Sequence, residues 1–203
     1  MNKMTKKITR AFIIIVLLAA ALITGYFFLN EHMNNTTGGD KLPRTEMGKL
    51  LAKDLDNRYP QLPTEVVKLY WRLTACIYGT DINDKNFDKL LKQLRKLYDE
   101  ELLAHSDNSF ENMRKHLKRD SKKRSAEKQT ISSYVVQKDD TVYKKEIDGR
   151  ECATVISSTL VKAKSKTTKT YENFMCRRDK EGKWKILGWQ QTTADVADEV
   201  GVE

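Results

Sequence analysis

The chain has 203 residues, of which 32% are charged and 39% hydrophobic, with nine glycines and three prolines. This composition excludes a disordered chain and favours one folded domain with a short extension. The formal net charge is +9, but four of the 37 basic residues lie in the first ten positions, where there are no acids. The remainder carries 33 Lys and Arg against 28 Asp and Glu. That excess is too small to indicate nucleic acid binding.

The segment Ala11–Leu29 is an uncharged run of 19 residues, AFIIIVLLAAALITGYFFL. As a helix with a rise of ~1.5 Å per residue it would cover ~28 Å, close to the hydrocarbon core of a bilayer. A cleavable signal peptide has a shorter apolar run followed by a small-residue cleavage site. This run instead ends in the bulky residues Tyr26 to Leu29. The sequence therefore predicts an uncleaved transmembrane anchor at 11–29, and a cleaved signal peptide is the alternative.

The charges around the anchor predict its orientation. Residues 1–10 contain Lys3, Lys6, Lys7 and Arg10, and loops rich in Lys and Arg stay in the cytoplasm. The amino terminus is therefore expected in the cytoplasm of a single-pass cell-membrane protein. A polar linker at 30–42 would then connect the anchor to an extracytoplasmic domain at 43–193. Residues 194–203 are expected to form a loosely held tail.

Four amphipathic helices are expected in the first half of the domain, at about 45–57, 65–78, 84–103 and 109–119. The second has apolar residues at i, i+3, i+4 and i+7 from Val66, and Thr64 is its expected N-cap. The third has the longest apolar stripe, from Phe87 to Leu102.

Five β-rich segments follow, at 130–137, 142–147, 151–164, 169–178 and 183–192. Asp148-Gly149 between the second and third is a strong hairpin signal, and Ser165–Thr168 and Asp179–Gly182 are the next expected turns. Short turns between consecutive strands favour an antiparallel meander. Helices first and a sheet second is the α+β pattern.

This order of elements resembles the NTF2-like superfamily. The resemblance is carried by 66–78, by 87–103 and by the closing hairpin Glu181–Trp189, EGKWKILGW. It implies three to four helices packed on a curved antiparallel sheet. An NTF2-like domain behind one span also resembles the VirB8-like subunits of conjugation and secretion machines. The stretches 50–55, 59–63 and 66–70 look like those of an uncharacterised bacterial family of single-span membrane proteins.

No motif in the chain indicates catalysis, a cofactor or a metal. Cys76, Cys152 and Cys176 have no metal-ligand spacing and are interpreted as three inert buried thiols, although one disulfide is the alternative. The segment Asp81–Asp88 partly resembles a calcium loop. Position 5 of such a loop would be Lys85, so its polar residues are interpreted as helix caps. No catalytic, cofactor-binding or metal site is predicted.

The segment Arg114–Lys128 is the strongest local concentration of charge, with eight Lys and Arg against two acids. On an extracytoplasmic domain it could bind an anionic cell-wall polymer or outer-leaflet lipid. The simpler interpretation is a solvated helix end.

Seven aromatic residues could line a pocket between helices and sheet: Tyr70, Trp71, Tyr134, Tyr143, Tyr171, Trp184 and Trp189. NTF2-like domains often use such a cavity for small ligands or catalysis, whereas large aromatics in strands more often pack in the core. We therefore expect a non-enzymatic module that binds protein partners in a membrane complex. A small-ligand-binding or enzymatic cone domain is the alternative.

Overall fold

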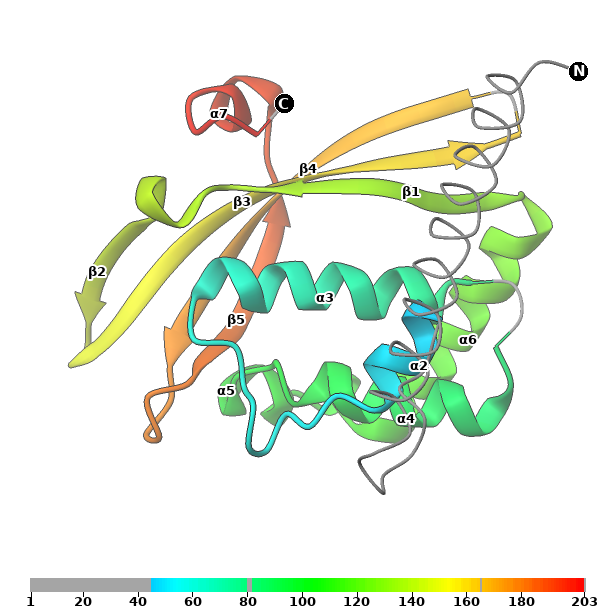
Figure 1. Ribbon diagram of the computed structural model, residues 1–203, viewed down its shortest axis with the longest axis horizontal. Helices are drawn as coiled ribbons and strands as arrows, with labels where there is room; N and C mark the ends of the chain where they lie inside the picture. Colours follow the sequence, from blue (N-terminus) through cyan, green and yellow to red (C-terminus); the bar gives the residue numbers. More distant parts are fainter. Residues whose placement is uncertain (1–44, 80–81, 165, 203) are drawn as a thin grey trace, which may run out of the picture. The chain divides into compact units, whose positions relative to one another are not determined.

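The computed structural model describes residues 45–79, 82–164 and 166–202. The expected cytoplasmic segment at 1–10, the anchor at 11–29 and the linker at 30–42 lie outside these residues. Within the described ranges, no helix is both long enough and apolar enough to cross a membrane. The described residues form an α+β domain with a five-stranded antiparallel sheet (Figure 1), which confirms the predicted fold class at this level.

Most helices precede the strands, and one short helix follows them. The helices are α2 (Glu46–Leu51), α3 (Pro63–Ile77), α4 (Asp84–Arg95), α5 (Glu100–Ala104), η1 (Ser106–Asn108), α6 (Phe110–Ala126), η2 (Asp139–Thr141) and α7 (Ala194–Asp198). The strands are β1 (Gln129–Val136), β2 (Tyr143–Ile147), β3 (Arg150–Ala163), β4 (Lys166–Arg178) and β5 (Trp184–Gln191).

The long strand β3 organises the sheet, whose order is β1-β3-β4-β5. On one side β3 pairs with both β2 and β1: Thr154 faces Tyr143 of β2, and Ser158 faces Val135 of β1. On the other side it pairs with β4 along almost its whole length. Strands β2 to β5 therefore form the expected meander. The prediction was wrong for β1, which pairs with the far half of β3 and not with its neighbour in sequence.

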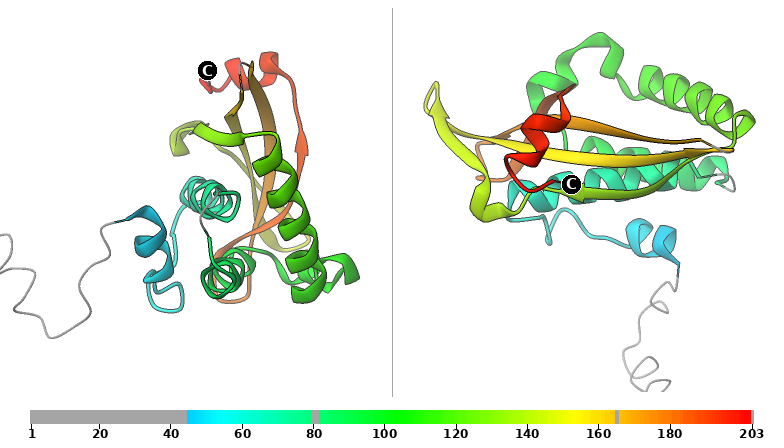
Figure 2. Two further views of the ribbon diagram at one scale, coloured as in Figure 1. Left: turned by 90° about the vertical axis from the view of Figure 1, so that its right-hand side faces the viewer. Right: turned by 90° about the horizontal axis from the view of Figure 1, so that it is seen from above.

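Helices α3 and α4 lie on one side of the sheet, which we call the inner face (Figure 2). Because side chains alternate along a strand, the inner face carries Val155, Phe174 and Ile186, all fully buried. The opposite side, which we call the outer face, carries Ile156. There the carboxyl-terminal segment covers Ile156 with the buried side chains of Ala197, in the short helix α7, and of Val202, which follows it.

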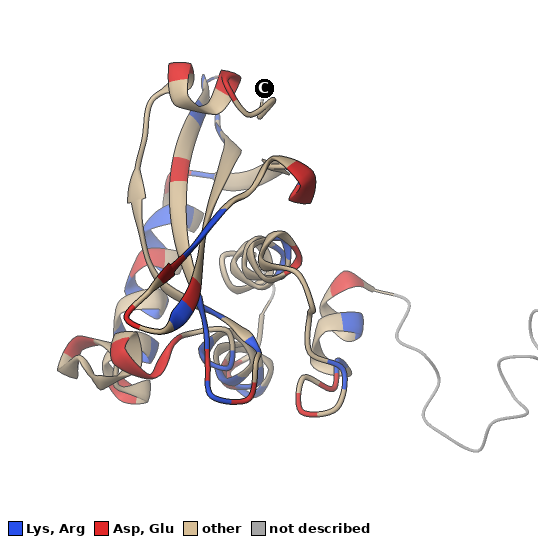
Figure 3. Ribbon diagram, turned by 90° about the vertical axis from the view of Figure 1, so that its left-hand side faces the viewer, with Lys and Arg blue, Asp and Glu red and all other residues tan. Residues whose placement is uncertain are grey.

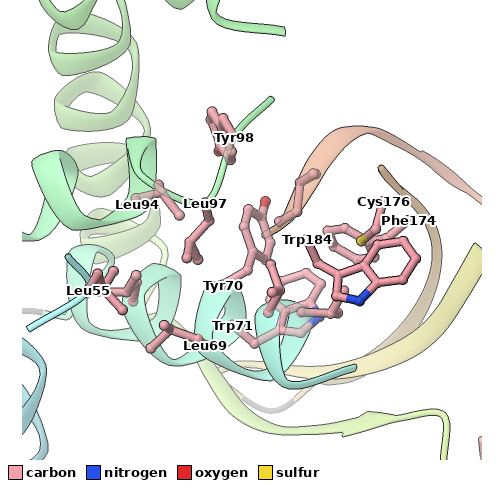
Figure 4. Packing of buried hydrophobic residues seen from close by; sticks show 14 of the residues in the cluster. Leu55, Leu69, Tyr70, Trp71, Leu94, Leu97, Tyr98, Phe174, Cys176 and Trp184 are labelled. Carbon is pink, nitrogen blue, oxygen red and sulfur yellow. The ribbon is translucent and has the colours of Figure 1, made fainter. Parts of the chain in front are cut away.

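One hydrophobic core fills the space between the helices and the inner face. Figure 4 shows Tyr70 and Trp71 of α3 pointing toward Phe174 and Trp184 of the sheet, with Leu94 and the residues after α4 closing the other side. The stripes predicted from helical periodicity are buried as expected, including Val66, Leu69, Leu73, Ile77, Phe87, Leu90, Leu91 and Leu97.

The third predicted helix, 84–103, is two helices. Residues 96–99 leave the helix because they pair with the edge of β5: the Ile186 amide donates to Leu97 O and the Asp99 amide donates to Ile186 O, both at 2.8 Å. The apolar stripe continues through the break, since Leu97 and Tyr98 are buried on both sides of this pairing. Periodicity alone therefore could not reveal the interruption.

The ends of the other helices also differ from the prediction. Helix α2 stops at Leu51, because Asp54 accepts hydrogen bonds from the amides of Asp56 and Asn57 and forms a turn. Helix α3 begins at Pro63, before the predicted cap Thr64. Proline suits a first helical turn. The Glu65 carboxylate accepts hydrogen bonds from the amides at positions 61 and 62, which lie just before the helix.

One helix and one strand are longer than predicted. Helix α6 continues to Ala126, past the predicted end at 119, although no apolar stripe extends beyond Leu117. Strand β4 starts at Lys166 and not at 169, because Lys166 already pairs with Ala163 of β3 and the chain turns at Lys164, whose φ is 48°. The predicted loosely held tail at 194–203 is instead anchored on the outer face by Ala197 and Val202, both fully buried.

Candidate functional site

The outer face has a row of paired residues that crosses four strands and carries two exposed apolar side chains. Tyr143 of β2 faces Thr154 of β3, Thr154 faces Met175 of β4, and Met175 faces Gly188 of β5. The Tyr143 and Met175 side chains are 65% and 43% exposed. Exposed apolar residues that adjoin one another are more informative than scattered ones, because water makes such surface costly. We call these four residues the outer-face row.

A β-bulge hollows the end of this row. Met175 pairs with Gly188 but the next residue, Cys176, pairs with Ile186, so Leu187 has no partner on β4. A Cβ atom at Gly188 would meet nothing within 4 Å, which leaves the floor of the depression open. The groove measures about 320 Å³, and its lining consists of Thr154, Asn173, Met175, Leu187, Gly188, Trp189 and Gln190. Bulges often re-aim a strand beside a functional surface.

Next to the groove, α7 already covers the same face. Ala197 of α7 and Val202, which follows the helix, are buried and pack with Ile156, and Tyr171 packs beside them. Ile156 lies two residues after Thr154 on β3, so the surface covered by α7 continues directly into the outer-face row. The row is therefore an exposed part of a sheet face that α7 and the residues after it cover at Ile156.

The predicted aromatic residues only partly meet. Tyr70, Trp71 and Trp189 come together on the inner face, joined by Tyr98 and Phe174, which sequence reasoning missed. Ring centroids of this cluster lie 5.1 Å apart for Tyr70–Phe174 and 5.9 Å apart for Phe174–Trp189, whose planes stack. At these distances the rings touch. They fill the space between α3 and the sheet at this point and do not line a hollow there.

The other four predicted aromatics lie elsewhere. Tyr143 is on the outer face, and Trp184 is buried in the core with the Arg178 guanidinium 4.6 Å from its ring centre. Tyr171 packs beside α7, and Tyr134 lines a separate shallow depression of about 170 Å³.

A polar chain lies beside the aromatic cluster on the inner face. The hydroxyls of Thr159 and Thr170 are 2.8 Å apart, and Thr170 donates to Glu172 Oε1 at 2.8 Å. The other carboxylate oxygen of Glu172 and the Thr74 hydroxyl of α3 are both buried and have no hydrogen-bond partner among residues 45–79, 82–164 and 166–202. Burial raises the pKa of Glu172 above its usual value, because removing water disfavours the charged form.

The basic segment Arg114–Lys128 forms most of α6, and Figure 3 colours the Lys and Arg residues of the fold blue. Part of its charge is used within the fold. Arg114 Nε lies 2.6 Å from Asp88 of α4, Lys118 Nζ lies 2.7 Å from Asp84, and Arg124 stacks over Tyr78. The cations that remain exposed, and have no ion pair within the described ranges, are Lys115, Lys122, Lys123 and Lys128. This arrangement resembles the solvated helix end that the sequence suggested.

The polar residues at the start of α4 act as predicted for helix caps. Asn83 accepts a hydrogen bond from the Asn86 amide at 2.9 Å and caps the helix. Over residues 45–79, 82–164 and 166–202, no group of three or more His, Cys, Asp or Glu side chains could hold a metal ion. Position 81 of the loop lies outside these ranges.

The three cysteines are unpaired. Cys152 faces Arg177 and Cys176 faces Ala153, so the two thiols point to opposite faces of the sheet. Burial raises the pKa of all three thiols, for Cys176 to about 12. Such thiols remain protonated and are poor nucleophiles. Cys76 is half-buried and not fully buried as predicted.

The outer-face row was not visible in the sequence, because its members are single residues on four strands. Only the register brings them together. No curated protein matches the chain. Residues 1–189 match the family described as a domain of unknown function, DUF6715, and because that match covers most of its length the chain belongs to this family.

Proposed function

We propose that the chain is a single-pass cell-membrane protein with its amino terminus in the cytoplasm, whose NTF2-like extracytoplasmic domain binds protein partners in a membrane complex. The anchor and its orientation are supported by the apolar run at 11–29 and the basic residues before it. The NTF2-like assignment is supported by helices packed on the inner face of a twisted antiparallel sheet. A tether behind such a domain is the VirB8-like arrangement.

The outer-face row is the observation that carries the binding role. Tyr143 and Met175 expose apolar surface that lies continuous with the surface covered by α7. The proposed occupant is a short amphipathic segment of a partner protein, which would cover the row as Ala197 and Val202 cover Ile156. Large side chains such as Tyr and Met are common in the centres of protein interfaces.

Crosslinking in intact membranes tests this proposal. Treatment of membranes with a short amine-reactive crosslinker should give protein-containing complexes larger than the monomer, and Met175→Glu should remove them. Asp107→Glu, an exposed substitution on η1 away from the row, is the matched control and should leave the complexes unchanged. Recovery of only monomeric protein, or complexes that survive Met175→Glu, would contradict the proposal.

The membrane topology has its own test. A protease added to intact cells or to spheroplasts should digest the domain after position 44, and a tag placed before Met1 should be protected. Protection of the domain would reverse the proposed orientation. Release of the domain as a soluble protein would support cleavage of the 11–29 segment.

The second candidate function, a small-ligand-binding or enzymatic cone domain, is favoured by one feature. Glu172, two residues before Phe174 on β4, has a buried carboxylate oxygen with no hydrogen-bond partner in the described part of the chain. A ligand with a hydrogen-bond donor could satisfy that oxygen. If this function operates, a screen of small amines and amides should produce compounds that raise the melting temperature of the wild-type protein but not of Glu172→Gln.

A further inference from the structure

A basic groove lies where the segment after α2 meets α3. It measures about 410 Å³, and its lining consists of Lys53, Arg58, Tyr59, Pro60, Gln61, Glu65, Lys68, Leu69 and Arg72. This volume is within the range of small-ligand sites. The groove is distinct from the outer-face row and from α6, and the proposed function leaves it unused.

Three of the cations that line the groove are not paired with an acidic side chain of the described residues. Lys53, Arg58 and Lys68 form no ion pair with any residue of the described ranges, whereas Arg72 Nε lies 2.6 Å from Glu46. One carboxylate, that of Glu65, also lines the groove, but it accepts hydrogen bonds from the amides at 61 and 62. A concave surface with several cations and one engaged acid has a positive potential that attracts anions.

The groove walls are held by contacts to other elements. Gln93 of α4 donates to Lys53 O at 2.6 Å, and the Tyr59 hydroxyl donates to Trp184 O of β5 at 2.7 Å. Asp54 accepts two amide hydrogen bonds between these points. The backbone that carries Lys53 and Arg58 is therefore positioned before any ligand binds. Such preorganisation reduces the entropy lost on binding.

We propose that this groove binds a phosphate group through Lys53, Arg58 and Lys68. Phosphate suits the site because it carries more charge than a carboxylate, and its oxygens can accept hydrogen bonds from both Arg and Lys. The group could belong to a soluble phosphate compound or to a lipid headgroup. The lipid source rests on the proposed membrane anchor. Residues 30–44 number 15 and, at ~3.4 Å each, cannot extend beyond about 50 Å, so the domain would stay near the bilayer surface.

The α6 surface provides a comparison within the same chain. It also forms a depression, of about 420 Å³, lined by Glu111, Arg114, Lys115, Lys118, Arg119 and Lys122. Its cations come from one helix, however, and Asp84 and Asp88 neutralise two of them. Removing three exposed charges there changes the net charge of the protein as much as removing three from the groove. The α6 substitutions therefore distinguish binding at a specific site in the groove from a general electrostatic attraction to a basic protein.

The test uses the full chain in a neutral maltoside detergent and three proteins: wild type, K53Q/R58Q/K68Q, and the control K115Q/K122Q/K123Q. The soluble probes are inorganic phosphate and glycerol 1-phosphate, measured by calorimetric titration at constant ionic strength. For the lipid, hydrogen exchange of residues 52–69 is compared between nanodiscs of phosphatidylcholine alone and with phosphatidylglycerol added. Thermal melting confirms that each variant folds.

Each lost cation is expected to weaken phosphate binding by roughly a factor of five. A soluble phosphate ligand would be supported if either soluble probe binds the groove variant about hundredfold more weakly than wild type and binds the α6 control as tightly as wild type. A lipid headgroup would be supported if residues 52–69 are protected from hydrogen exchange only in nanodiscs that contain phosphatidylglycerol. This protection should be lost in the groove variant and kept in the α6 control. No binding in either arm, or equal loss in the α6 control, would overturn the proposal. Neither result depends on crosslinking through Met175, so phosphate binding and the proposed binding of protein partners can fail separately.

Discussion

Asp99 and Arg177 form a buried ion pair that joins the start of α5 to the outer face of β4. Arg177 Nε lies 3.1 Å from Asp99 Oδ2, its Nη2 contacts Asp99 Oδ1, and the two residues are 1% and 9% exposed. The same carboxylate accepts a hydrogen bond from the Glu101 amide at 2.9 Å and so caps α5. The pair therefore fixes the segment in which the predicted third helix is interrupted.

Asp99→Asn should destabilise the domain by about 3 kcal/mol, because it leaves the Arg177 charge buried beside a neutral group. Glu101→Gln is the matched control: Glu101 contacts the same guanidinium at 3.0 Å but is exposed, so its loss should cost less than about 1 kcal/mol. Urea unfolding of both variants measures the difference. Equal losses would show that burial of the pair is unimportant.

The same pair should make stability fall in acid. Burial alone would raise the pKa of Asp99, but hydrogen bonds from Arg177 and the Glu101 amide outweigh it and hold the pKa below its usual value. Folding thus favours the ionised form of Asp99. The stabilisation from the ion pair is therefore fully present above the pKa of Asp99 in the unfolded chain, which is about 4. It is lost as pH falls through the lower folded value. The free energy of unfolding of wild type and Asp99→Asn should therefore converge below about pH 4. A difference that stays constant down to pH 2 would contradict this assignment.

Glu172 should show the opposite sign. Its folded pKa is raised by burial, so protonation favours the folded state and the stabilisation is fully present below the unfolded pKa of about 4.3. It is lost as pH rises through the folded pKa. At neutral pH the charged, partly unpartnered carboxylate is a cost, and Glu172→Gln should raise the melting temperature. The gain should shrink toward pH 4, whereas exposed Asp107→Asn should give no such trend.

The Tyr59 hydroxyl should stabilise the domain through its 2.7 Å hydrogen bond to Trp184 O. Tyr59→Phe leaves that carbonyl buried without its donor and should cost about 1–2 kcal/mol. Tyr143→Phe removes a hydroxyl from a side chain that is 65% exposed, and should be neutral within about 0.5 kcal/mol. Chemical denaturation compares the two variants. A neutral Tyr59→Phe would mean that water replaces the hydroxyl without loss.

The carboxyl-terminal helix should be part of the stable domain. Val202, which follows α7, is fully buried against Ile156, whereas Val196 on α7 is 38% exposed. Val202→Asp should therefore destabilise the protein by about 2–3 kcal/mol, because it places a charge in an apolar contact. Val196→Asp should have little effect. Similar melting temperatures for both variants would restore the sequence-based view of a loosely held tail.

The sequence predicted the helices and strands largely correctly, because apolar periodicity and turn residues are local signals. It placed Phe87, Leu90 and Leu94 on one buried face, and the Asp148-Gly149 hairpin is present. It could not predict the break before Asp99, which depends on pairing between residues 97–99 and Ile186. It also could not predict that β1 pairs with β3, since neither strand has a sequence signal for its partner.

The candidate surfaces were still less accessible to sequence reasoning. Tyr143 and Met175 are 32 positions apart and become neighbours only through Thr154. The groove cations Lys53, Arg58 and Lys68 are spaced like ordinary surface charges, and only the fold shows which of them lack acids. Conversely, the conspicuous run at 114–128 is partly neutralised by Asp84 and Asp88, which lie on another helix.

Site-specific photocrosslinking can show whether a partner protein binds the outer-face row. A photoreactive amino acid is placed at position 175 of the full chain in native membranes, and at position 107 as an exposed control. Binding at the row should give a discrete ultraviolet-dependent adduct at 175 that is absent at 107 and is lost when Tyr143→Glu is added. The same adducts from both positions, or none from 175, would contradict it.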